Sequence, residues 1–262
     1  MNTRGETPSR RKFLGIAGVA TAAAMAQSSL PLVAGSEVLA AGKPGRHRWG
    51  FLIDLERCIG CKACSVACKT EHNVPLGVFR CSVKEHEEGA YPQATRHFVP
   101  WRCNHCENPV CVADCPVDEI EATFIWPDQS RASYRKRATY QRPDGLVLVD
   151  QDHCIGCGAC VDLCPYKARF LNPVRKSEDG DPVADKCSSC AHQLDAGVRP
   201  ACVVTCQAEA RVVGDLNDPE SEISQRIKDR QVAVLLPGKG TEPQCLYLGL
   251  NPAAYAEGRD TR

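Results

Sequence analysis

The stretch Cys58-Ile-Gly-Cys-Lys-Ala-Cys-Ser-Val-Ala-Cys68 recurs, with the same spacing of its four cysteines, as Cys154-Ile-Gly-Cys-Gly-Ala-Cys-Val-Asp-Leu-Cys164. Each stretch reads C-x2-C-x2-C-x3-C. The first three cysteines fall on a tight loop, in which Gly60 or Gly156 allows backbone N–H groups to turn toward a bound group. The fourth cysteine lies about one turn into a following helix and points away from the loop. The pattern predicts a loop that holds one cofactor with three thiols, and a fourth thiol directed at a neighbouring site.

This spacing is that of iron–sulfur proteins in which the fourth cysteine ligates the other cluster of a pair. A zinc site uses four ligands in two short pairs, so a third cysteine at the same interval would have no role there. Two further groups could pass for zinc sites by themselves, but beside the first two they are better interpreted as expanded versions of one motif. Sixteen of the eighteen cysteines are thus predicted to hold four [4Fe–4S] clusters, in four quartets: Cys58, Cys61, Cys64 and Cys68; Cys103, Cys106, Cys111 and Cys115; Cys154, Cys157, Cys160 and Cys164; Cys187, Cys190, Cys202 and Cys206.

Short runs of branched and aromatic residues flank the quartets and predict strands. The order strand, cluster loop, short helix, strand is that of a ferredoxin-like unit, so we expect an internally repeated, loop-rich α+β fold that the clusters hold together. Residues 118–142 interrupt this rhythm and form either a solvated loop or a loop that docks a partner. The predicted strands are residues 49–54, 97–101, 145–150, 168–171 and 211–214, and residues 219–230 are expected to form a short surface helix.

The first forty residues are interpreted as a targeting segment. Ser9-Arg10-Arg11-Lys12-Phe13-Leu14 precedes a mild apolar run rich in alanine and glycine, and small residues recur near residue 40. This resembles a twin-arginine export signal; a basic tail or a membrane anchor is the alternative, although the run is too short to span a bilayer comfortably. A twin-arginine signal predicts export of the folded, cluster-loaded protein to the periplasm, where ligation protects its thiols from oxidation.

The composition limits the partners. The 32 basic and 32 acidic residues cancel, which gives no reason to expect nucleic acid or an anionic membrane surface. No later segment is predicted to cross a membrane, so membrane association would come through a partner. Each filled cluster site adds a charge of about −2, which makes the loaded protein roughly −8.

The chain resembles the four-cluster iron–sulfur subunits of respiratory complexes, such as dimethyl sulfoxide, polysulfide, tetrathionate and formate-dependent nitrite reductases. The residues that carry the resemblance are Cys58 to Lys69, Asn73-Val-Pro-Leu-Gly77, Cys154 to Tyr166, Ala184-Asp-Lys-Cys187 and Gly214-Asp-Leu-Asn-Asp-Pro219. Two features depart from the family pattern: Gln207 stands where a proline usually follows the last cysteine, and the 118–142 segment is longer than usual.

The resemblance implies that the quartets exchange their fourth cysteines and that one module is inserted in another. The modules would be residues 49–94 plus 183–217, with quartets one and four, and the inserted residues 95–182, with quartets two and three; residues 1–40 are the signal and 218–262 a C-terminal extension. The implied ligand sets are Cys58, Cys61, Cys64 and Cys206; Cys187, Cys190, Cys202 and Cys68; Cys103, Cys106, Cys111 and Cys164; Cys154, Cys157, Cys160 and Cys115.

The resemblance also implies a non-catalytic role in electron transfer. A chain with its own export signal fits the nitrite-reductase-associated subunit, the tetrathionate reductase subunit or the periplasmic iron–sulfur subunit of the sulfite-reduction-associated Dsr complex. The last is preferred, and it would relay electrons between a quinone-interacting membrane subunit and a c-type cytochrome. The alternative is the iron–sulfur subunit of a molybdopterin oxidoreductase, such as a tetrathionate or polysulfide reductase. An enzyme acting at one of its own clusters would need an open iron site, and sixteen matched ligands leave none.

The remaining candidates are secondary. His105 lies inside the second quartet and His153 directly precedes the third. Both are expected to neighbour a cluster or lie at the surface, because each quartet is already complete. Cys81 and Cys245 are expected to be buried thiols or to form a disulfide. Four cations abut cluster ligands and either offset thiolate charge or are solvated: Lys69, Arg102, Lys167 and Lys186.

Overall fold

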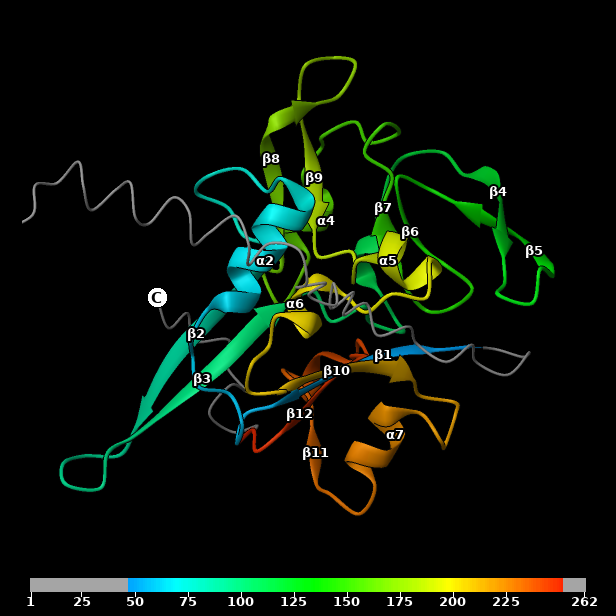
Figure 1. Cartoon of the computed structure of the whole chain (residues 1–262). Helices are drawn as coiled ribbons and strands as arrows, with labels where there is room; N and C mark the ends of the chain where they lie inside the picture. The colour runs from blue at the N-terminus through cyan, green and yellow to red at the C-terminus, as the bar shows by residue number, and fades with distance from the viewer. Residues whose placement is uncertain (1–46, 252–262) are drawn as a thin grey trace, which may run out of the picture. The chain divides into compact units, whose positions relative to one another are not determined.

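The computed structural model describes residues 47–251. It mixes short helices with small sheets, in agreement with the predicted α+β class (Figure 1). The predicted signal, residues 1–40, and the end of the predicted C-terminal extension, residues 252–262, lie outside the described residues. The elements are β1 (Trp49–Asp54), α2 (Ala63–His72), β2 (Cys81–Glu88), β3 (Thr95–Arg102), α3 (Val110–Ala113), β4 (Ile120–Ile125), β5 (Arg131–Lys136), β6 (Thr139–Gln141), β7 (Val147–Val149), α4 (Ala159–Asp162), β8 (Arg169–Lys176), β9 (Pro182–Lys186), α5 (Ala191–Asp195), α6 (Ala201–Val204), β10 (Arg211–Asp215), α7 (Glu222–Ile227), β11 (Val232–Ala233), the 3-10 helix η1 (Pro237–Lys239) and β12 (Cys245–Leu248).

The largest sheet has the strand order β10-β1-β12-β11. Strand β1 pairs antiparallel with β10 and parallel with β12, and α7 packs Ile223, fully buried, against this sheet. The run of buried residues in β1 follows from its central position, since both of its faces are covered. Strands from the C-terminal part of the chain thus complete the sheet that β1 begins.

The pairing of β1 with β10 brings the first and fourth quartets together. Strand β1 ends just before Cys58, and β10 begins just after Cys206. Because the two strands are antiparallel, the end of β1 lies beside the start of β10, with Ile53 opposite Arg211. The loop after β1, with Cys58, and the loop before β10, with Cys206, therefore meet at the same end of the two strands.

The helices repeat the same pairing. Helix α2, which carries Cys64 and Cys68, packs against α6, which carries Cys202. Helix α3, which carries Cys111, packs against α4, which carries Cys160. Quartet one thus lies against quartet four, and quartet two against quartet three.

Two hairpins extend from this arrangement, one formed by β2 and β3 and one by β4 and β5 (Figure 1). The second hairpin accounts for most of residues 118–142, so this segment is a regular structure and not an irregular loop. Its strands alternate between exposed and half-buried residues, as expected of a hairpin with one face toward solvent.

The predicted local structure of the cluster loops is present. Gly60 and Gly156 have φ angles of 69° and 75°, in the left-handed region that glycine adopts without strain. A Cβ atom on Gly60 would also lie 2.3 Å from the ring of Phe98 in β3. The first loop therefore needs glycine both for its turn and for the close approach of the β2–β3 hairpin.

Candidate metal centres

All cysteines are free thiols. Cys81 and Cys245, which are outside the quartets, are 3% and 1% exposed, so the structure has them as buried thiols and not as a disulfide. The predicted ligand sets are named here site A (Cys58, Cys61, Cys64, Cys206), site B (Cys187, Cys190, Cys202, Cys68), site C (Cys103, Cys106, Cys111, Cys164) and site D (Cys154, Cys157, Cys160, Cys115).

The four thiols of site C line one cavity. Cys103, Cys106 and Cys111 come from the second quartet, and Cys164 reaches the cavity from the third, with Pro165 and Arg169 beside it. Burial and the neighbouring Cys103, Cys111 and Cys164 raise the pKa of Cys106 to about 12. Such mutual repulsion of thiolates is what a bound iron cluster relieves.

The thiols of sites A and B also interact across quartets. Burial raises the pKa of Cys68, and Cys187, Cys202 and Cys190 of the fourth quartet raise it further. Burial likewise raises the pKa of Cys58, with Cys206 and Cys61 acting in the same direction. The fourth cysteine of quartet one therefore lies near the first three of quartet four, and the reverse also holds.

The placement of site D rests on the backbone around it. Cys115 follows α3 and Cys160 lies in α4, and these helices pack together. His153, directly before Cys154, has its Nε2 atom 3.3 Å from the carbonyl oxygen of Asp118. The segments that carry Cys115 and Cys154 thus run side by side.

Four buried cations surround the thiols, and none has a carboxylate partner within the part of the chain that the structure describes. Arg102, Arg169, Lys186 and Arg211 are between 1% and 5% exposed. The buried carboxylates are paired elsewhere, for example Asp185 with Arg80 at 2.7 Å. Burying an unpaired charge is costly, so these cations require an anionic group, and thiolate-ligated clusters supply one.

The cations contact the thiols directly or through short links. The Nη2 atom of Arg169 donates to Cys111 Sγ at 2.9 Å, and that of Arg211 donates to Cys81 Sγ at 3.2 Å. Burial lowers the pKa of Arg211, but Cys81, Cys202 and Cys64 outweigh it and leave the pKa raised. The thiols that these guanidinium groups face favour the charged form of the arginines.

Several buried polar atoms near the thiols lack a hydrogen-bond partner among residues 47–251. They are Ser65 Oγ, Arg102 Nε and Nη1, both side-chain polar atoms of Asn104, and Arg211 Nη1. Ser65 and Asn104 each directly follow a cysteine of a quartet. The N–H and O–H groups in this set can donate to the sulfur atoms of a cluster, whereas Asn104 Oδ1 can only accept. The unpaired donors therefore fit the predicted cofactor.

His105 and His72 neighbour the thiols. The Nδ1 atom of His105 accepts a hydrogen bond from the backbone N–H of Val147 at 3.1 Å, which leaves Nε2–H to donate to Ser189 Oγ at 3.0 Å. His72 Nε2 lies 3.2 Å from Cys190 Sγ, and burial lowers its pKa to about 4. His105 was among the histidines singled out by its sequence position, whereas the role of His72 was not predicted.

The structure separates the four cations that the sequence singled out. Arg102 and Lys186 are buried beside the thiols, as the charge-offsetting interpretation requires. Lys69 donates to backbone carbonyls and lies over Phe79, and the Lys167 side chain donates to the carbonyl of Asp162. Arg169 and Arg211 were missed, although each stands five residues after the last cysteine of its quartet.

No helix within residues 47–251 is long and apolar enough to cross a bilayer. Over the same span, no group of three or more His, Cys, Asp or Glu side chains is arranged to hold a single metal ion.

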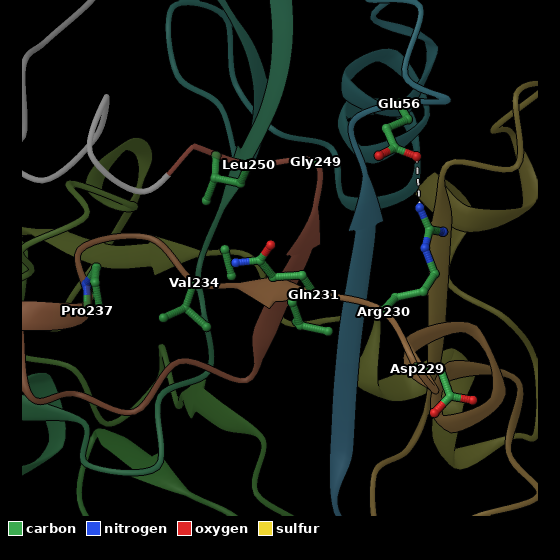
Figure 2. A pocket seen from close by; sticks show the side chains of 10 residues that line it. Glu56, Asp229, Arg230, Gln231, Val234, Pro237, Gly249 and Leu250 are labelled. Atoms are coloured by element: carbon green, nitrogen blue, oxygen red, sulfur yellow. Dashed lines mark hydrogen bonds and ion pairs between the residues drawn. The ribbon is translucent and has the colours of Figure 1, made fainter.

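A separate cavity lies between Glu56, the segment 229–237 and residues Gly249 and Leu250 (Figure 2). The Arg230 side chain donates to Glu56 Oε2 at 2.8 Å across it. No cysteine lines this cavity, so it is not one of the candidate centres.

Comparison with known proteins agrees with the thiol geometry. A family model described as a 4Fe-4S dicluster domain matches residues 94–216, and one described as a 4Fe-4S binding domain matches residues 49–70. The B subunit of tetrathionate reductase from Salmonella typhimurium is 41% identical over 254 residues, which cover 94% of this chain and 90% of the relative. A putative dimethyl sulfoxide reductase iron-sulfur subunit from Halobacterium salinarum is 39% identical, covering 76% and 78%. Protein NrfC of Escherichia coli K12 is 36% identical, covering 96% and 98%.

Proposed function

Since this chain belongs to the family of [4Fe–4S] iron–sulfur subunits that includes the B subunit of tetrathionate reductase, we propose that it relays electrons within a reductase complex whose catalytic subunit carries molybdopterin. A membrane subunit that exchanges electrons with quinone would complete the complex. The relatives favour this function over the Dsr-type complex, because two of those named above are subunits of tetrathionate and dimethyl sulfoxide reductases.

The observation that carries the proposal is the cavity lined by Cys103, Cys106, Cys111 and Cys164. It joins three cysteines of one quartet to the last cysteine of another, which is the arrangement of a paired-cluster ferredoxin unit. The repeated packing of α2 on α6 and of α3 on α4 extends this arrangement to the other sets. The proposed ligands are therefore those of sites A, B, C and D, with the module of sites C and D inserted in that of sites A and B.

The burial of the cysteine thiols differs among the four sites and indicates their order. All four thiols of site B are buried, as are three of the four in site C, whereas sites A and D each contain one exposed cysteine, Cys61 and Cys157. Shared cations link neighbouring sites: Arg211 faces thiols of sites A and B, Arg102 those of sites B and C, and Arg169 those of sites C and D. The sites thus form a row A-B-C-D with accessible ends and a water-excluding middle.

The chain contributes positioning, exclusion of water and electrostatics to this function. A bound [4Fe–4S] cluster supplies reversible one-electron chemistry. The protein holds the thiols on loops whose glycines permit the turn, and buries the inner sites. Ile59 and Ile155, 62% and 47% exposed, flank the accessible thiols and mark one docking point at each end of the row.

We further propose that the protein acts in the periplasm after export by the twin-arginine route. Support comes from Ser9-Arg10-Arg11 and the apolar run after it. Export of the folded protein would let the clusters be inserted before the thiols meet an oxidising compartment.

Purification of the tagged protein from native membranes in mild detergent tests the proposal. We expect about one molybdenum or tungsten atom per copy of this chain. Complexes that contain c-type haem but neither of these metals would contradict it and favour a function like that of a nitrite-reductase-associated or Dsr-type subunit.

The same purification tests the two docking points. Ile59→Glu and Ile155→Glu place a charge at opposite ends of the row, so each variant should lose one partner subunit and keep the other. Val174, which is 74% exposed and is not adjacent to a quartet cysteine in the sequence, supplies the control Val174→Glu, which should keep both partners. Loss of the same partner in both isoleucine variants would contradict the assignment of separate ends.

A further inference from the structure

Three buried arginines lie between neighbouring sites of the row, one each at the A–B, B–C and C–D junctions. Arg211 lies opposite Ile53 of β1 and donates to Cys81 Sγ at 3.2 Å. Although burial lowers its pKa, the thiols of Cys64 in site A and Cys202 in site B raise it. Arg102 directly precedes Cys103 of site C and donates to Oγ of Ser189, which stands between Cys187 and Cys190 of site B in the sequence. Its charge also acts on the pKa of Cys103. The A–B and B–C junctions thus each have an arginine that faces thiols of both adjoining sites.

The third junction has the same arrangement. Arg169 donates to Cys111 Sγ of site C at 2.9 Å and also interacts with Cys160 of site D. All three arginines remain charged at any ordinary pH, because a guanidinium group does not release its proton. Each junction therefore holds an arginine with a fixed positive charge, and the junction of sites B and C also has Lys186 beside Cys103 and Cys187.

The arginines are held in place by groups that carry no compensating charge. The Arg102 guanidinium carbon lies 3.7 Å from the centre of the Phe51 ring, and that of Arg211 lies 5.7 Å from the same ring. Arg102 also donates a hydrogen bond to Ser189 Oγ. Because no carboxylate pairs with these arginines within the described residues, their charge acts on the cluster sites without being neutralised.

The positions follow the internal repeat of the chain. Arg169 and Arg211 each begin the strand that follows a last cysteine, β8 or β10. Arg102 directly precedes the first cysteine of quartet two, and Lys186 stands at the same place before quartet four. Cations at equivalent positions in both modules indicate a feature of the cluster sites and not of one local contact.

We propose that Arg211, Arg102 and Arg169 set the reduction potentials of the clusters, each raising the potentials of the two sites that it lies between. Reduction adds one electron to a site that is already negative when loaded. A fixed positive charge in a water-poor interior stabilises the reduced form more than the oxidised form. This inference rests on the proposed ligand sets.

Potentiometric titration of the isolated, cluster-loaded protein, followed by electron paramagnetic resonance, tests the inference with Arg211→Gln, Arg102→Gln and Arg169→Gln. Each substitution should lower two of the four midpoint potentials, with at least a tenfold change in the ratio of reduced to oxidised cluster at a fixed potential, or about 59 mV for one electron. The two end sites should each respond to one variant: one midpoint moves only in the Arg211 variant and another only in the Arg169 variant. The two inner sites should each respond to two variants: one midpoint moves in the Arg211 and Arg102 variants, and the other in the Arg102 and Arg169 variants. This pattern needs no prior assignment of signals to sites.

Three controls separate charge from folding. Arg211→Lys, Arg102→Lys and Arg169→Lys keep the charge and should keep the midpoints. Arg142→Gln removes a buried arginine that pairs with Asp144 and Asp195 and should leave all four midpoints unchanged. A glutamine variant that does not load its clusters is replaced by the corresponding methionine variant, which buries no unpaired polar group.

Two results would overturn the inference in a protein that loads four clusters: midpoints that stay unchanged in the neutral variants, or lysine variants that shift as far as the glutamine variants. Iron content distinguishes a failure of the inference about the arginines from a failure of the proposed ligand sets. A wild-type chain that holds fewer than four clusters would contradict the ligand sets themselves, whatever the arginine variants do.

Discussion

Replacing Cys68 with alanine will damage the cluster of Cys187, Cys190 and Cys202 and leave that of Cys58, Cys61 and Cys64 intact. Cys68 is the last cysteine of the first quartet, yet its thiol lies near the thiols of the fourth quartet. An incomplete ligand set loses iron because the exposed corner of the cluster is no longer held. Iron analysis of single and double variants distinguishes this cross-ligation from ligation within one quartet.

The iron content of double variants distinguishes cross-ligation from ligation within one quartet most clearly. Combining Cys68→Ala with Cys187→Ala affects one site, so the loss of iron should not exceed about four atoms out of about sixteen. Combining Cys68→Ala with Cys58→Ala affects two sites, and the loss should approach about eight atoms. The reverse order of losses would show that each quartet holds its own cluster. Cys245→Ala, at a buried thiol outside the quartets, is the control and should retain all the iron.

Removing the clusters will unfold the protein. Arg102, Arg169 and Arg211 are buried without carboxylate partners in the region the structure describes, and breaking a buried ion pair by removing one partner costs about 3–5 kcal/mol. Three such losses are comparable to the whole stability of a typical domain, about 5–15 kcal/mol. The thiols also form part of the main buried cluster of side chains, so their detachment from iron opens the core.

Circular dichroism and limited proteolysis, before and after anaerobic chelation, measure this effect. We expect the chelated protein to lose its cooperative thermal transition and to become protease-sensitive. Anaerobic addition of iron and sulfide should restore both properties. A metal-free protein that melts cooperatively near the temperature of the loaded protein would show that the polypeptide folds independently of its clusters.

The cysteine spacing was the most informative part of the sequence because the tight loop and the following turn of helix are local structures. The strands beside the quartets were also predicted, since β1, β3, β7, β8 and β10 coincide with runs of branched and aromatic residues. Helix α7 falls within the predicted surface helix at residues 219–230. These features depend on neighbours in the chain, and sequence patterns report such neighbours directly.

The features that sequence reasoning missed depend on distant neighbours. Nothing near Arg211 in the chain indicates that Cys64 will act on its charge, because the pairing of β1 with β10 brings the two segments together. Strand β12 enters the main sheet parallel to β1, a register that local patterns do not encode. Residues 118–142 were expected to form an insertion. The alternating residues on either side of Asp128 were not recognised as two paired strands, nor the segment around Asp128 as the turn between them.

Iron, acid-labile sulfide and zinc contents of the purified chain, together with its Mössbauer spectrum, test the central claim most directly. Four [4Fe–4S] clusters on sixteen thiols predict about sixteen iron and about sixteen sulfide per chain, with a spectrum of cubane clusters only and no zinc. About eight iron with zinc in the remaining sites would contradict the account, because quartets two and four would then be zinc sites and the row of four clusters would not exist.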